Sequence, residues 1–427
     1  MVKLNEDLVQ AIRGAVEARR ESAVGLLREL VRTPSVTGEE GAVGEVVERA
    51  FSERGLDVDT WDATPEEMKP YRDHVGEQDS YENRPNVAGV RRGTGGGRSI
   101  LLNGHVDTVD PGDPAAWKDD PLSGNLEGDL LYGRGSCDMK GGLVTHLVAL
   151  DVLSDLDLGL RRDVTVAATV GEEDGGLGAL STVLRGYRAD AALVTEPTRL
   201  ALVPAHCGSL VFRLTVTGLS AHAAVRDEGV SALEKFLPIF EELRAFERER
   251  NDTLSHPLYN GIRNKVPINV GVVRAGNWAS TVPESLVAEG RIGLIPGEEL
   301  DPFKRQVADR LSSITETDPW LREHPPELEW FGGQFAPAEV PPDAPICEAV
   351  KKAHELATGE KPRVEGFTGG ADMRLFIRFG GMPCVMYGAG DVNVAHAPDE
   401  HINVTELLTA TSTIACLLAD WCGLEKQ

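Results

Sequence analysis

SILLNGHVDTV (residues 99–109) is an apolar run of strand length that ends in polar residues, and two similar runs follow it, DVTVAATVGEE (163–173) and DAALVTEP (190–197). The stretches between them, 140–154 and 176–186, have the apolar spacing of helices. Strands that alternate with helices predict an α/β domain with a mostly parallel central sheet. In such sheets ligands bind beyond the carboxyl ends of the strands, where these runs carry their polar residues.

The pattern changes near residue 209. SLVFRLTVTG alternates apolar and polar residues as a half-buried strand does, and a helix pattern and two further strand patterns follow it. We expect an inserted α+β domain over 209–325 with its own sheet, and a discontinuous first domain over 1–208 and 326–427. The Pro-rich stretch PWLREHPPELEWFGG is expected to be irregular, and the first thirty residues are expected to form one or two helices.

Size and charge agree with two folded domains. The chain has 427 residues, and one core stops growing at roughly 250 to 300 residues. Its 68 acidic residues exceed its 43 Lys and Arg, which gives a formal net charge of -25. This field repels nucleic acid phosphates and anionic membranes, so we expect no partner of either kind. The ordinary explanation of the excess acid is a well-solvated surface.

No export signal or membrane span is expected, because the first residues lack an apolar core and no run of about 18 apolar residues occurs. The six cysteines show no C-x-x-C spacing and are expected to be reduced thiols in a cytoplasmic protein. The glycine-rich run GTGGGR (93–98) precedes a strand instead of following one, so it predicts a turn and not a phosphate loop.

His105 and Asp107 lie two residues apart at the end of the first run, so their side chains should share one face. A metal-bound histidine commonly gives its second ring N–H to a carboxylate, and Asp107 suits that role. Taken alone, an H-x-D pair is more often structural.

Further candidate ligands lie in loops beyond other predicted strands. Asp138 stands in a glycine-rich turn before a helix, where the ordinary interpretation is a helix cap. Glu172 and Glu173 are adjacent and should project in opposite directions, so that one can bind metal while the other faces a water molecule. Glu196 ends the third run, and His396 lies near the carboxyl terminus. Two histidines and three carboxylates suit Zn²⁺, with Co²⁺ or Mn²⁺ as substitutes.

Seven ordered blocks carry a resemblance to a known family: LLNGHVDTV, YGRGSCDMKGG, GEEDGG, VTEP, GLSAHAA, TGGADMR and HAPDEHINV. Over essentially its whole length the chain resembles the M20 metallopeptidases, which include acetylornithine deacetylase and succinyl-diaminopimelate desuccinylase. The resemblance implies a zinc-peptidase-like catalytic domain and an inserted ferredoxin-like domain that dimerises.

The resemblance also implies a role for each residue. Asp138 would bridge two metals, with His105 and Glu196 completing one site and Glu173 and His396 the other. Glu172 would be the general base, and Asp107 would orient His105.

Residues of the later blocks are implied to handle the substrate. His222 in GLSAHAA would come from a partner subunit and stabilise the oxyanion, although alone it would be taken for a loop histidine. Arg291, Gly370 and Arg374 would contact the substrate, because an arginine fork suits carboxylates.

The reaction implied is removal of an acyl group from an N-acylated amino acid or amine. Glu196, in place of Asp, resembles the deacylase and carboxypeptidase branches more than the aminopeptidases. The segments RPNVAGV, PINVGVVRAGNWASTVPE and DPWLREHPPELEWFGG look most like the acetylornithine deacetylase-like subgroup that includes formylaminopyrimidine deformylases. The alternatives are a metallo-carboxypeptidase or dipeptidase of the same family and a non-catalytic metal-binding paralogue. A serine hydrolase is excluded, because the chain has no G-x-S-x-G elbow.

Overall fold

The computed structural model describes residues 3–76, 78 and 80–426, which form two compact units. The first unit contains the chain up to Pro204, Glu339–Glu365 and the chain from Ala371 onward. The second contains Ala205–Ala338 and Gly366–Gly370. The range expected for the inserted domain from the sequence was 209–325.

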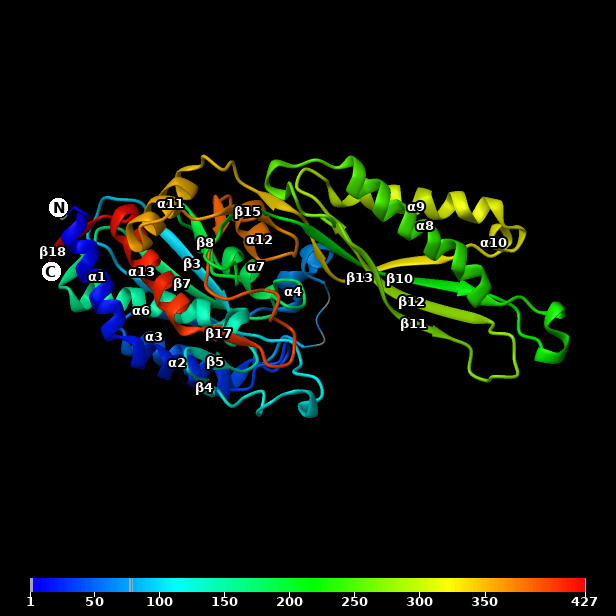
Figure 1. Ribbon diagram of the computed structural model, residues 1–427, viewed down its shortest axis with the longest axis horizontal. Helices are drawn as coiled ribbons and strands as arrows, with labels where there is room; N and C mark the ends of the chain where they lie inside the picture. Colours follow the sequence, from blue (N-terminus) through cyan, green and yellow to red (C-terminus); the bar gives the residue numbers. More distant parts are fainter. Residues whose placement is uncertain (1–2, 77, 79, 427) are drawn as a thin grey trace. The chain divides into compact units, whose positions relative to one another are not determined.

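The first unit is built on the large sheet visible in Figure 1. In spatial order its strands are β1 (Asp57–Asp62), β2 (Pro85–Arg91), β7 (Val164–Thr169), β3 (Ile100–His105), β8 (Ala192–Val194), β16 (Cys384–Met386), β9 (Leu202–His206) and β14 (Ala338–Glu339), and β15 (Val364–Phe367) pairs with β9. Smaller sheets join β4 (Leu126–Glu127), β5 (Leu130–Tyr132) and β17 (His401–Asn403), and β6 (Leu158–Leu160) with β18 (Leu424–Lys426).

The sheet is mixed. The four central strands β7, β3, β8 and β16 are parallel, whereas β1, β2 and β9 run antiparallel to their neighbours. The α/β class is confirmed, but the prediction of a mostly parallel sheet is wrong outside the centre. Parallel neighbours need a crossover connection, and the helix patterns 140–154 and 176–186 lie in the connections between central strands.

Helices cover both faces of this sheet. One face carries α1 (Glu6–Ala18), α2 (Arg20–Arg32), α3 (Gly41–Glu53), α6 (Gly141–Asp155), α11 (Pro345–Thr358) and α13 (Val404–Trp421). The other face carries α4 (Pro65–Met68), α7 (Leu177–Leu184) and α12 (Met373–Arg378). The two opening helices were predicted, and α1 and α2 confirm them.

The elements that lead to the polar loops are fully buried. All six residues of β3 are buried, because helices cover both faces of the central strands. Helix α6 is apolar around nearly its whole circumference, since it lies between the sheet and α13. The loops at the ends of these elements therefore start from rigid positions.

The second unit follows the order strand, helix, strand, strand, helix, strand. Its main elements are β10 (Gly208–Thr217), α8 (Ala232–Thr253), β11 (Ile268–Ala275), β12 (Ser285–Leu294), α9 (Leu300–Thr317), α10 (Pro319–Glu323) and β13 (Glu327–Phe335). The antiparallel sheet order β11-β12-β10-β13 is the ferredoxin-like arrangement. The alternate residues of β10 pack beneath α8 and α9 in a separate core.

Strand β13 corrects one expectation. The prolines of PWLREHPPELEWFGG predict an irregular stretch, but Pro325 and Pro326 follow a short helical segment and precede a regular strand. From Glu327 onward no proline remains within the strand, and its residues pair with β10.

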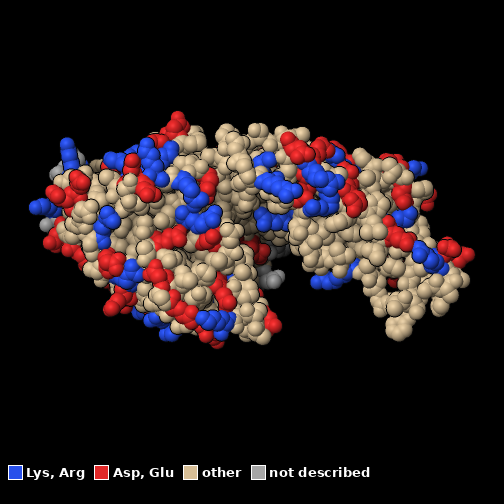
Figure 2. Space-filling view, in the orientation of Figure 1, with Lys and Arg blue, Asp and Glu red and all other residues tan. Residues whose placement is uncertain are grey.

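The surface in view mixes charges of both signs. Figure 2 shows Lys and Arg side chains interspersed with Asp and Glu over this face. Among the described helices, none has the length and apolar character needed to cross a bilayer.

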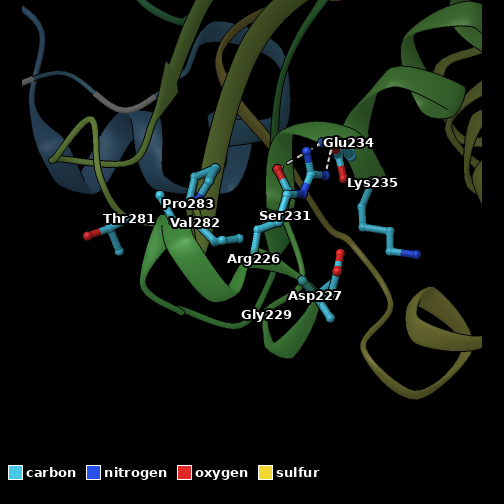
Figure 3. Close-up of a pocket in the computed structure, with 11 residues that line it drawn as sticks. Arg226, Asp227, Gly229, Ser231, Glu234, Lys235, Thr281, Val282 and Pro283 are labelled. Carbon is cyan, nitrogen blue, oxygen red and sulfur yellow. Dashed lines mark hydrogen bonds and ion pairs between the residues drawn. The ribbon is translucent and has the colours of Figure 1, made fainter.

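A surface pocket in the second unit lies beside the loop that follows His222. Figure 3 shows it between the turn of Arg226 and the segment Thr281–Pro283, with an ion pair of 2.7 Å between Arg226 and Glu234 at its edge. Its walls carry charges of both signs.

Candidate metal centre

His105 is the last residue of β3 and is buried at the carboxyl end of the central sheet. Its Nδ1 lies 3.0 Å from the main-chain oxygen of Asp107 and 3.5 Å from the Asp107 carboxylate. The closer acceptor is thus the main chain of Asp107, where the sequence analysis expected the carboxylate. With Nδ1 held in this way, Nε2 is directed outward beyond the strand end.

Asp138 lies opposite His105, in the turn that begins η3 (Ser136–Lys140). Its Oδ1 is 3.0 Å from Nε2 of His105, and its Oδ2 is 3.3 Å from Nε2 of His396. The two oxygens of one carboxylate therefore face two different histidines. This is the arrangement that a bridging ligand requires.

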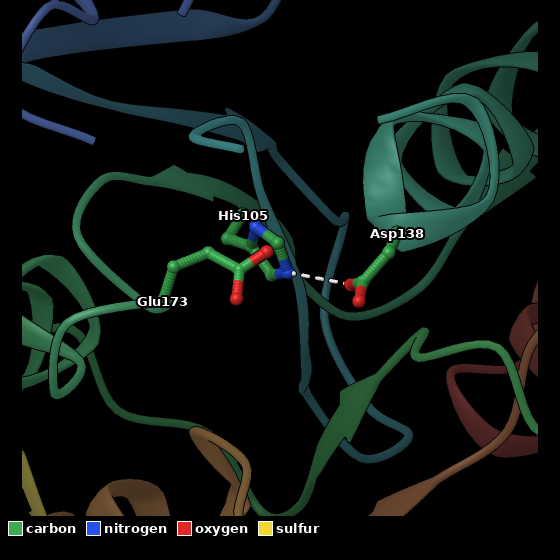
Figure 4. Close-up of side chains that lie close together, drawn as sticks. All are labelled: His105, Asp138 and Glu173. Atoms are coloured by element: carbon green, nitrogen blue, oxygen red, sulfur yellow. Dashed lines mark hydrogen bonds and ion pairs between the residues drawn. The ribbon is translucent and has the colours of Figure 1, made fainter. Parts of the chain in front are cut away.

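Glu173 completes the group from the loop after β7. Its Oε1 lies 2.9 Å from Nε2 of His396. Ligand atoms of His105, Asp138 and Glu173 all lie within 4.8 Å of one another. Figure 4 shows these three side chains pointing toward a common space. Four of the five predicted ligands are thus brought together by contacts.

Glu196, the fifth predicted ligand, follows β8 and is 5% exposed. Its carboxylate is close enough for the charges of Asp138 and His105 to affect its pKa. Glu196 therefore lies near the cluster. Glu172 is also buried, and its pKa is affected by the charges of Asp372 and Glu196.

The electrostatics of the cluster fit a bound cation. Burial, followed by the charge of Asp138, raises the pKa of Glu173 and of Glu196. Hydrogen bonds to Asp138 and Glu173 raise the pKa of His396 to about 10. These buried carboxylates repel one another, and a divalent cation relieves that repulsion while it displaces protons from its ligands. Imidazole and carboxylate donors are those that Zn²⁺, Co²⁺ and Mn²⁺ accept.

Asp107 fastens the loop that carries both glutamates. Its Oδ1 accepts the N–H of Glu172 at 3.1 Å, and its Oδ2 accepts the N–H of Glu173 at 3.2 Å. The hydroxyl of Thr37 adds a bond of 2.9 Å to Oδ2. Asp107 therefore positions a second loop as well as His105.

Arg374, predicted to contact the substrate, is bound to protein in the structure, and its role toward substrate stays a prediction. It is 2% exposed, and its guanidinium donates to the main-chain oxygens of Ala371 at 3.0 Å, His74 at 3.1 Å and Gly175 at 2.6 Å. Because protein carbonyls take up these donors, Arg374 secures the turn after Glu173.

Three other predicted residues lie in the second unit. His222 is exposed, and its Nδ1 accepts the N–H of Ala224 at 3.1 Å. Arg291 is exposed on β12, and its guanidinium makes no hydrogen bond or ion pair to any residue that the structure describes. A side chain at Gly370 would collide with the ring of Phe335, which explains the glycine by close packing. Their roles toward substrate stay predictions.

Glu400 and Arg134 were not among the predicted site residues. Glu400 is buried against the turn of Asp138 and pairs with Arg134. The only sequence signal was that Glu400 belongs to the block HAPDEHINV; nothing in its spacing connects it to a turn more than 250 residues earlier.

The fold and the cluster together define an α/β protein with a candidate divalent metal centre. The sequence pattern of peptidase family M20/M25/M40 matches residues 101–420. The chain belongs to this family, whose members are dinuclear metal enzymes that hydrolyse amide bonds.

Curated relatives match over nearly the full chain. N-formyl-4-amino-5-aminomethyl-2-methylpyrimidine deformylase of Halalkalibacterium halodurans is 28% identical, with 100% of both chains covered. Acetylornithine deacetylase of Edwardsiella ictaluri is 27% identical over 94% of this chain and 98% of the relative. The structure of human carnosine dipeptidase 1 superposes with a TM-score of 0.75 at 15% identity, covering 97% of this chain and 99% of that one, which shows the shared fold.

Proposed function

We propose that this protein removes a small acyl group, acetyl or formyl, from the nitrogen of an amino acid or amine, with two divalent metal ions, Zn²⁺ foremost and Co²⁺ or Mn²⁺ as substitutes. The observation that carries the proposal is the Asp138 carboxylate, whose two oxygens face His105 and His396 at 3.0 and 3.3 Å. On this basis Asp138 is shared, His105 and Glu196 hold one ion, and Glu173 and His396 hold the other.

The chain's own residues supply the proton transfer. When bound, the two ions activate a water molecule and polarise the substrate carbonyl. Glu172 takes the proton of that water on its carboxylate and returns it to the leaving nitrogen. Burial, followed by the charge of Asp372, raises the pKa of Glu172 well above its usual range, which strengthens it as a base. The bonds from Asp107 to the loop amides keep Glu172 in position.

The chemistry of the second unit favours an anionic substrate. Arg291 is an unpaired guanidinium in a chain with 25 excess negative charges, and it suits a substrate carboxylate. This favours an N-acyl amino acid over an uncharged pyrimidine. Dipeptide hydrolysis is the second candidate, because solved structures of dipeptidases share the fold. Relatives at 26 to 28% identity are deacylases by name, which ranks deacylation first.

A dimer is part of the proposal, with His222 of one copy serving the metal centre of the other. Support comes from the second unit, which holds six of the nine exposed large apolar side chains of the described chain: Leu219, Val225, Leu233, Leu237, Val273 and Trp278. Exposed apolar side chains that gather in one unit support an association site there. A cytoplasmic location fits the six buried cysteines, none of which forms a disulfide.

The test is an assay of the zinc-loaded or cobalt-loaded protein against matched compounds. N-acetyl and N-formyl amino acids are compared with the corresponding N-acyl amines, with the N-formylated aminomethylpyrimidine and with dipeptides. We expect release of the acyl group from the amino acids, and a rise in KM for these substrates alone in Arg291→Gln. Cleavage of dipeptides alone would favour the second candidate. Loss of both reactions, with metals bound, would favour a non-catalytic paralogue.

A further inference from the structure

Glu400 is a buried carboxylate that contacts the turn carrying Asp138. It is 0% exposed, and its Oε1 accepts the N–H of Cys137 at 3.0 Å and the N–H of Asp138 at 3.1 Å. Its Oε2 accepts a bond of 2.5 Å from Nη1 of Arg134, which is 3% exposed. A charge-assisted acceptor therefore holds the two amides directly at the shared ligand.

The turn needs such an acceptor. Asp138 has φ -118° and ψ 97°, and Met139 has φ -132° and ψ 36°, so neither follows helical geometry. Buried amides without a partner are costly, and a carboxylate that binds both of them fixes the direction of the peptide from which the Asp138 side chain projects.

Glu400 also fixes the segment that carries His396. Its main-chain oxygen accepts the N–H of Gly133 at 2.8 Å, and the next residue, His401, pairs with Tyr132 where β17 meets β5. Glu400 thus joins the segment that leads to Asp138 with the loop that contains His396. Glu400 therefore connects the segments that carry two candidate ligands, Asp138 and His396, which are far apart in the sequence.

We propose that Glu400, supported by Arg134, is a positioning residue that holds the Asp138 carboxylate between the two metal sites. The proposal rests on the two-metal function above. An ordinary buried ion pair would stabilise the fold and leave metal affinity unchanged, whereas a positioning residue sets the affinity of the centre. Partners that orient ligands typically change metal affinity about 10-fold to 100-fold when replaced.

The experiment measures Zn²⁺ stoichiometry and affinity by competition with a chromogenic chelator, with thermal stability recorded alongside. Glu400→Gln keeps the shape and removes the charge, and Glu400→Asp keeps the charge and withdraws the acceptor from the two amides. The matched control is Asp151→Asn, which weakens the Arg54 to Asp151 ion pair of 3.0 Å on α6, away from the five ligands.

We expect Zn²⁺ affinity to fall about 10-fold or more in both Glu400 variants and to stay at the wild-type value in Asp151→Asn, even where its melting temperature falls as far. Wild-type Zn²⁺ affinity in either Glu400 variant overturns the inference. If Glu400→Gln binds Zn²⁺ as tightly as the wild type, Glu400 has a structural role only. If Glu400→Asp does so, the charge of the residue matters and its bonds to the two amides do not. Wild-type protein that binds fewer than two ions would instead contradict the proposed function.

Discussion

Asp107 illustrates how one buried carboxylate organises other titratable groups around it. Burial alone would raise its pKa, but the neighbouring His105, the amide of Glu172 and the hydroxyl of Thr37 together lower it. It therefore stays ionised while its neighbours Glu172 and Glu173 have raised pKa values. Neighbouring carboxylates thus differ in basicity because the bonds that each accepts differ.

His146 on α6 is a second buried titratable group, and we expect it to make the free energy of unfolding depend on pH. It is 0% exposed, its Nε2 lies 3.1 Å from the hydroxyl of Thr195, and burial lowers its pKa from 6.5 to about 3. Between these values the unfolded chain binds a proton that the folded chain does not, so stability falls as the pH is lowered from about 6.5.

The variant His146→Gln lacks this proton and can still bond to Thr195. In urea unfolding at pH 7 and pH 5, we expect the wild-type free energy of unfolding to drop by about 2 kcal/mol more than that of His146→Gln. Equal drops in the two proteins would show that His146 is not held neutral.

The candidate metal ligands could be singled out at the residue scale because each stands in a short block of fixed spacing at the end of a strand or turn. Asp107 and Arg374 were harder. The sequence indicates that they lie near the ligands, but only the folded chain shows that Asp107 bonds to the loop amides and that backbone carbonyls occupy Arg374. Hydrogen-bond partners depend on tertiary contacts, which sequence spacing does not encode.

At the scale of elements, the predictable parts were those with strong apolar periods. The central strands and α6 are buried on all sides, and their sequences are correspondingly apolar. Strand β13 was not predicted because the prolines just before it indicate irregular structure. The antiparallel direction of the edge strands of the large sheet was not predicted either, because strand direction depends on how the connections pass over the sheet.

Strand β11 lies at one edge of the second sheet, with Val273 49% exposed. An edge strand presents unpaired backbone groups that a second copy can pair with. We expect the wild-type protein to be a dimer in light scattering coupled to gel filtration, and Val273→Glu to shift it toward monomer with loss of activity. Leu126→Glu, on the exposed strand β4 of the first unit, is the control and should stay dimeric. A monomeric wild-type protein would contradict the dimer.

At the scale of the whole molecule, the two units have separate cores and carry different candidate functional residues. The large sheet of the first unit holds the five candidate ligands at strand ends and loops. Within the described chain, the second unit has an exposed histidine, an arginine whose guanidinium has no partner, and six of the nine exposed large apolar side chains. Most of the excess of acidic residues lies in the first unit, and Figure 2 shows acidic and basic side chains mixed over the face in view. The excess of negative charge suits attraction of cations.

The central claim is a two-metal centre bridged by Asp138, with Glu172 as the base. The most direct measurement determines metal ions per chain by mass spectrometry, together with turnover of an N-acyl amino acid, in the wild-type protein and in Glu172→Gln. We expect two ions per chain in both proteins and a turnover lower by about 100-fold or more in the variant, since general bases contribute roughly 100-fold to 10,000-fold. One ion or none in the wild-type protein, or undiminished turnover in Glu172→Gln, would contradict the account.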